Sequence, residues 1–154
     1  MLRRLSLVLV LALVAGSAPL RAESTPVING EVSGFELCEQ AVCGAAIFAG
    51  LYHGQVGFNP LALGLMSVAV THEDLPSVGD TADITGGTWR LRLLSGRLIS
   101  GIVTGGTLAH PEDDDTFDAT VHLQVLSGGS GTLTFEGVLD HNVFPPTVIG
   151  SLGD

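Results

Sequence analysis

The chain contains no lysine, and its 6 arginines face 16 acidic residues, which gives a formal net charge of −10. Three of the arginines (Arg3, Arg4 and Arg21) lie in the first 22 residues, so removing residues 1–22 moves the charge to −13. Proteins that bind nucleic acid displace phosphate counterions with clustered lysine and arginine. A chain with three arginines after residue 22 has no such cluster, and we expect it not to bind nucleic acid.

Long hydrophobic stretches are also scarce, and the longest covers residues 5–15 with Ser6 as its polar interruption. A membrane-spanning helix needs about 20 apolar residues, whereas a basic pair, a shorter apolar run and small residues are typical of a signal peptide. We therefore expect residues 1–22 to be a signal peptide, cleaved after Ser17 or Ala22; a short N-terminal membrane anchor is the alternative. Residues 23–154 would form a single exported β-domain, periplasmic or extracellular, with no membrane span.

Only two cysteines occur, Cys38 and Cys43, with four residues between them. An exported protein encounters an oxidising compartment, so this pair predicts a structural disulfide that closes a short loop. A redox pair normally has two intervening residues, and a zinc site needs further ligands close by. Two buried free thiols remain the alternative.

Helical periodicity is nearly absent after residue 22, and alternation of apolar and polar residues takes its place. It is clearest over residues 88–94, 117–125 and 133–139. Further strands are expected at the following positions: 45–52, 61–71, 97–103 and 147–152.

Glycine-rich turns separate these segments, as at Ser95-Gly96 and residues 128–131, while Gly86-Gly87 and Gly105-Gly106 indicate bulges or strand ends. The pattern predicts an all-β fold, an antiparallel up-and-down barrel of seven or eight strands. A meander or jelly-roll sandwich is the alternative. The abundance of small residues allows either a filled interior or a cavity.

An acidic run occupies residues 112–118, with five carboxylates among seven residues. Asp113, Asp115 and Asp118 are candidate ligands for Ca²⁺, because a hard cation relieves the repulsion between carboxylates. The run lacks the spacing of an EF-hand loop, so a solvated acidic turn is the alternative. No other cofactor is indicated.

Histidines and acids also cluster at predicted strand ends. Strand ends on one rim of a barrel converge, which makes a shared acid–base or metal site conceivable at that rim. The candidate rim residues are His72, Glu73, His110, Asp140 and His141. Exposed turn histidines are the alternative reading.

The three remaining arginines, Arg90, Arg92 and Arg97, lie on one predicted hairpin. Together they are a candidate site for an anionic ligand, since guanidinium groups bind carboxylates in a bidentate manner. In a chain with so many acids, pairing with the protein's own carboxylates is the competing interpretation.

No motif points to a particular reaction. Gly129-Ser130-Gly131 lacks the spacing of a nucleophile elbow, and no glycine-rich loop leads into a helix to hold phosphate. We therefore expect a non-enzymatic exported β-domain with a structural, envelope or binding role. The alternatives are a small barrel enzyme of isomerase or cyclase type and a carrier of a small apolar ligand, each with its site at one rim. The sequence does not identify a partner, and a small ligand and a second copy of the chain are the candidates.

Overall fold

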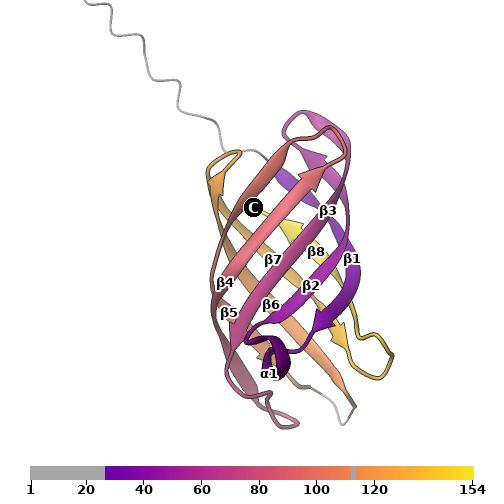
Figure 1. The fold of residues 1–154 in the computed structure, drawn as a ribbon, viewed down its shortest axis with the longest axis vertical. Coiled ribbons are helices and arrows are strands. Elements are labelled where there is room, and N and C mark those ends of the chain that lie inside the picture. Colours follow the sequence, from indigo (N-terminus) through magenta and orange to yellow (C-terminus); the bar gives the residue numbers. More distant parts are fainter. Residues whose placement is uncertain (1–26, 112–113) are drawn as a thin grey trace, which may run out of the picture.

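The computed structural model describes residues 27–111 and 114–154, and these form a closed barrel of eight antiparallel strands. Each strand pairs with its sequence neighbour, and β1 pairs with β8 to close the sheet (Figure 1). The elements are β1 (Ile28–Cys38), α1 (Gln40–Cys43), β2 (Ala46–Val56), β3 (Asn59–His72), β4 (Thr81–Leu93), β5 (Leu98–Ala109), β6 (Thr116–Ser127), β7 (Gly131–Asp140) and β8 (Thr147–Gly153). The predicted up-and-down barrel is confirmed, whereas the expected signal peptide lies outside the described residues.

The strands with the clearest alternation bury the predicted face. Trp89 and Leu91 of β4 and Leu123 of β6 are buried inside the barrel, while Arg90 and Gln124 are exposed outside it. The turn at Ser95-Gly96 is also as predicted, with the Gly96 amide donating to the carbonyl of Leu93. In these strands the alternation of apolar and polar residues was sufficient to predict which side chains are buried, because a strand in a barrel has one face inside and one outside.

The glycine pairs predicted to be bulges interrupt the strand register. The β3–β4 register shifts between Thr71 and His72, opposite Thr85 and next to Gly86-Gly87, and the β5–β6 register shifts between Val103 and Gly105. Gly87 has a φ of 145°, a conformation that L side chains rarely adopt. A bulge increases the local twist of a strand, which helps a sheet to close on itself.

The end of the barrel where β8 finishes is filled with side chains. Seven large residues are fully buried there, from the start of odd-numbered strands and the end of even-numbered ones: Ile28, Tyr52, Leu91, Ile99, Leu123, Leu133 and Leu152. Burial raises the pKa of Tyr52 to about 12, and its hydroxyl donates to the Gln55 carbonyl. These side chains are the most deeply buried part of a hydrophobic core that continues into the other half of the barrel.

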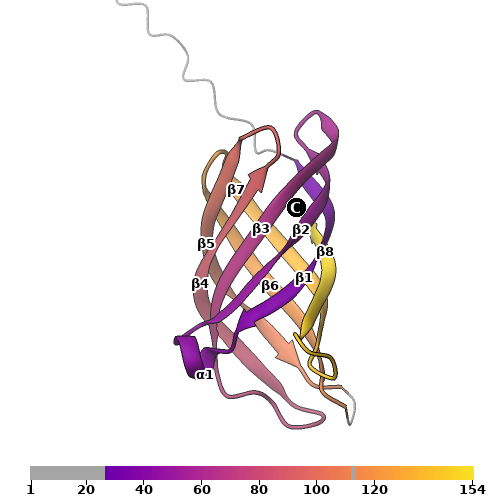
Figure 2. The same ribbon diagram turned by 45° about the vertical axis from the view of Figure 1, so that its right-hand side comes forward.

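The other end of the barrel carries α1, which lies beside the start of β2 and the end of β3 and away from the C-terminus (Figure 2). Here β1 and β2 approach closely through Gly34 and Gly50, which face each other in register. A Cβ added to Gly34 would lie 2.2 Å from the carbonyl oxygen of Ala49. Within the described part of the chain, no helix has the length and apolar character to cross a membrane.

Candidate functional site

A cavity of about 350 Å³ occupies the α1 end of the barrel. Most of its wall is apolar and comes from inward side chains of all eight strands, including Phe48, Met66, Val70, Leu108, Val121 and Phe135. The polar residues gather where it opens: Glu36, Glu39, Gln40, His72, Glu73, Asp74 and His141. The sequence left open whether the interior was filled or hollow. In the structure, side chains fill the end where β8 finishes, and the α1 end encloses the cavity.

Among the described residues, Glu36 is the one charged residue that is buried. It occupies an inward position near the end of β1, and its side chain is only 5% exposed. Its Oε2 lies 2.9 Å from Nε2 of His141, in the connection between β7 and β8. Among the described residues, neither atom has a further hydrogen-bond partner. These two atoms are buried against each other, while other atoms of both residues belong to the wall of the cavity.

The carboxylate of Glu36 raises the pKa of His141 above its ordinary value through their direct contact, and partial burial of the ring opposes this shift. The ring is also held in place: the His141 amide donates to the Asp115 carbonyl at 2.8 Å, and the ring packs edge-on against Phe117. The raised pKa favours an imidazolium beside the Glu36 carboxylate. Because Nε2–H and Oε2 are engaged with each other, the pair has Nδ1–H of the imidazolium as its remaining donor and Oε1 of the carboxylate as its remaining acceptor.

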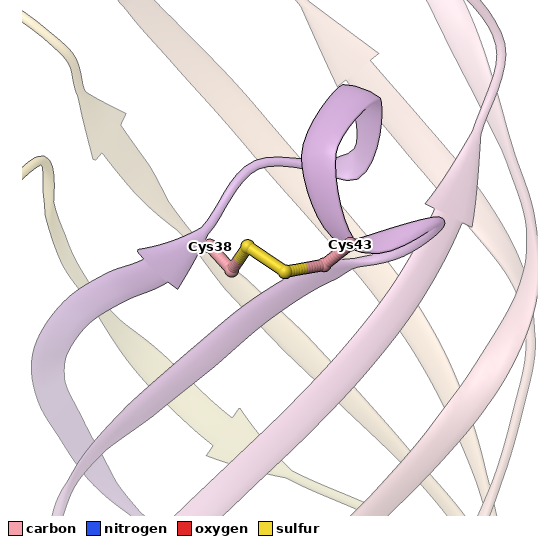
Figure 3. The surroundings of a disulfide bond; sticks show 2 residues. All are labelled: Cys38 and Cys43. Carbon is pink, nitrogen blue, oxygen red and sulfur yellow. A yellow bond between two sulfur atoms is a disulfide. The ribbon is translucent and has the colours of Figure 1, made fainter.

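The segment that contains α1 is fastened at the mouth of this cavity. The predicted disulfide joins Cys38 at the end of β1 to Cys43 at the end of α1, with their Cα atoms 6.1 Å apart (Figure 3). The side chain of Gln40 makes two hydrogen bonds to the backbone of His72, donating to the carbonyl at 2.8 Å and accepting from the amide at 2.7 Å. These links fix α1 to both β1 and β3, so one side of the mouth has a defined shape.

The structure brings together part of the rim site that the sequence predicted. His72, Glu73 and His141 all line the cavity mouth. His110 instead connects two loops, with Nδ1 2.9 Å from the Pro76 carbonyl and Nε2 2.6 Å from the Asp114 carbonyl. Asp140 accepts hydrogen bonds from the backbone and side chain of Asn142 and does not line the cavity.

The three arginines of the candidate anion site do not lie together. Arg90 and Arg92 project outward from β4, whereas Arg97 donates a hydrogen bond to the Gly128 carbonyl in the β6–β7 turn. Neither Arg90 nor Arg92 is ion-paired with a carboxylate within residues 27–111 and 114–154. The expected pairing with the protein's own acids is therefore not observed for these two side chains.

Of the three candidate Ca²⁺ ligands, Asp113 lies outside the described residues. Asp118 is exposed on β6, and the Asp115 carbonyl accepts the His141 amide. In the described part of the chain, no three histidine, cysteine, aspartate or glutamate side chains are arranged to hold a metal ion.

Sequence reasoning missed Glu36 because it missed β1. This strand has an inverted pattern: Phe35 and Leu37 face outward, while Gly34 and Glu36 face inward. The available signal was the recurrence of Ile28, Val32 and Glu36 at every fourth residue with glycines between them. That spacing places all three on one face of a strand.

Comparisons of the chain with protein-family models, with curated proteins and with solved structures found no match.

Proposed function

We infer that the protein is an exported, non-enzymatic binding protein that holds a small, largely apolar molecule in the cavity at the α1 end of the barrel. The observation that carries this proposal is the contrast between the two ends, one filled and one enclosing about 350 Å³. Protein interiors leave few voids larger than a water molecule, and ligand sites have volumes of about 300–1,000 Å³. A hollow of this size is consistent with an occupant.

The character of the wall supports a specific class of ligand. Apolar side chains surround most of the space, and the charged pair of Glu36 and His141 lies toward one side of its mouth. Such a site favours a hydrocarbon or aromatic body that bears one hydroxyl or similar group able both to donate and to accept a hydrogen bond. Binding would place that group at the pair and the apolar body deeper in the barrel.

Export is part of the proposal. The disulfide between Cys38 and Cys43 supports it, because structural disulfides persist in oxidising compartments. The apolar run of residues 5–15 after Arg3-Arg4 agrees with the same location.

The pair of Glu36 and His141 also favours a second candidate function, a barrel enzyme of isomerase type. A carboxylate and an imidazolium 2.9 Å apart beside an apolar cavity are suited to remove a proton from one atom of a bound molecule and return one to another. The two proposals share the same cavity and differ in whether the bound molecule is converted.

Binding is tested with the neutral fluorophore N-phenyl-1-naphthylamine. Trp89 is the single tryptophan and is buried in β4. We expect excitation of Trp89 to produce saturable emission from the bound fluorophore. Ala119→Phe puts a ring into the cavity and should abolish this signal. Thr120→Phe is the matched control, because the adjacent side chain faces outward, and it should leave binding unchanged.

Absence of saturable binding, or equal binding by Ala119→Phe and Thr120→Phe, would overturn the proposal. Native mass spectrometry of the exported protein then identifies a copurified ligand. Incubating that ligand with the protein discriminates the two functions. Unchanged ligand supports a binding protein, whereas an isomer that does not form with Glu36→Gln supports an enzyme.

A further inference from the structure

An apolar face covers one side of the outer wall of the barrel, over β3, β2, β1 and β8. Its exposed side chains are Leu63 and Leu65 of β3, Leu51 of β2, Phe35 and Leu37 of β1, and Ile149 of β8. Leu51 is 64% exposed and Ile149 is 63% exposed. Between them runs a groove lined by Phe35, Leu51, Leu65 and Ile149. On β6, at the opposite side of the closed sheet, Leu126 is a comparably exposed apolar residue among polar ones.

The flanks of this face carry opposite charges. Arg90 and Arg92 project from β4 at one flank, and both line the groove. Glu136 is exposed on β7 at the other flank, near the partly exposed Asp140. The row of paired residues that crosses the face runs Arg90, Ser67, Ala49, Phe35, Thr147, Asp140. We call the boundary between β1 and β2 the seam. β2 and β3 separate it from β4, and β1 and β8 separate it from β7, so it is equally far from the two charged strands.

We propose that this apolar face binds a second copy of the chain, with a twofold axis along the seam between β1 and β2. Such an axis places β4 of each copy opposite β7 of the other, because both strands are equally far from the seam. Arg90 of one copy then comes opposite Asp140 of the second copy, and Arg92 comes opposite Val138, between Asp140 and Glu136. The two arginines lack an ion-pair partner among the described residues of their own chain, and the second copy supplies one.

The apolar face by itself is smaller than a stable interface, so the flanks must contribute to the contact. Four strands at about 4.8 Å spacing give a width of about 19 Å, and the six steps from Leu61 to Ser67 along β3 add about 20 Å, which is about 380 Å² viewed flat. Stable interfaces bury about 800 Å² on each partner, with an apolar centre and a polar rim. The face supplies the centre and the charged flanks supply the rim. The cavity opens at the α1 end and not through this wall, so the inference does not depend on the proposed ligand.

Sedimentation velocity over a wide concentration series tests the contact. The wild-type protein is expected to sediment as a dimer, and Leu51→Ser with Leu65→Ser to weaken the dissociation constant about thirtyfold or more. Leu126→Ser removes a similarly exposed leucine from the opposite wall and should leave association unchanged. A wild-type monomer at every concentration overturns the proposal, as does equal weakening by Leu126→Ser.

Charge reversal tests the geometry separately. A chain with Arg92→Glu and a chain with Glu136→Arg should each self-associate about tenfold more weakly, because like charges then meet at both contacts. In an equimolar mixture both contacts become attractive, so the mixture should recover dimerisation. A mixture that associates no better than either variant alone overturns the assigned twofold axis and with it the proposed interface.

Discussion

Nε2 of His141 lies 2.9 Å from Oε2 of Glu36, and the Glu36 side chain is almost fully buried. Glu36 is on β1 and His141 follows β7, so closure of the barrel through β8 brings them together. The Glu36 amide also donates to the Pro146 carbonyl, just before β8. A buried carboxylate without a partner is strongly unfavourable, so this contact connects the chemistry of the cavity to the stability of the fold.

The first prediction concerns pH. Because the folded-state pKa of His141 is raised, its contribution to the free energy of unfolding is complete below the ordinary value of 6.5. It is lost as pH rises through the raised pKa. Urea unfolding of the wild type should therefore give a free energy that decreases above about pH 6.5. The free energy of unfolding of His141→Gln should decrease less over the same pH range.

His110 provides the control for this measurement. Its pKa is also raised, through hydrogen bonds to the carbonyls of Asp114 and Pro76, but it does not contact Glu36. His110→Gln should therefore remove a separate part of the pH dependence and leave the part due to His141. Identical pH slopes for the wild type and His141→Gln would contradict the role assigned to the Glu36 contact.

The second prediction concerns the disulfide. Replacing both Cys38 and Cys43 with serine should reduce the free energy of unfolding by about 2 kcal/mol, because the bridge restricts a short loop in the unfolded chain. Urea unfolding with and without reductant measures this difference. Reductant should destabilise the wild type by the same amount and leave the double variant unaffected; sensitivity of the double variant would show another cause.

The third prediction compares two buried leucines at opposite ends of the barrel. Leu133 belongs to the filled end, so Leu133→Ala creates a closed void and should cost about 4 kcal/mol. Leu108 already borders the cavity, so Leu108→Ala enlarges an open space and should cost about 2 kcal/mol. Chemical denaturation of both variants provides the comparison. Equal losses would indicate that the α1 end is as closely packed as the other.

The fourth prediction concerns the close approach of β1 and β2. Gly34→Ala would put a Cβ 2.2 Å from the Ala49 carbonyl oxygen, so the strands must separate, at a cost of about 3 kcal/mol or more. Gly153→Ala is the control, since its nearest neighbour would be 4.0 Å away, at Asn29 Oδ1. Thermal melting should show a large decrease for Gly34→Ala and almost none for Gly153→Ala; similar melting temperatures would contradict this explanation.

Much of the fold followed from local pattern. Alternation over residues 88–94 and 117–125 correctly predicted which side chains of β4 and β6 are buried, and Ser95-Gly96 marked a tight turn. The cysteine spacing predicted the disulfide. β1 was missed because Phe35 faces outward and Glu36 inward, which reverses the usual relation between polarity and burial. The expected signal peptide and the exported location remain predictions.

The sequence alone determined an all-β chain with antiparallel neighbours, because period-two alternation and turn residues act over a few positions. Tertiary structure decided that the barrel is filled at one end and hollow at the other, since that depends on the side chains that eight strands contribute at each level. It also joined Glu36 to His141 and left Leu51, Leu65 and Ile149 together on one outer wall. These relationships depend on strand register and closure, and neither is a property of any single segment.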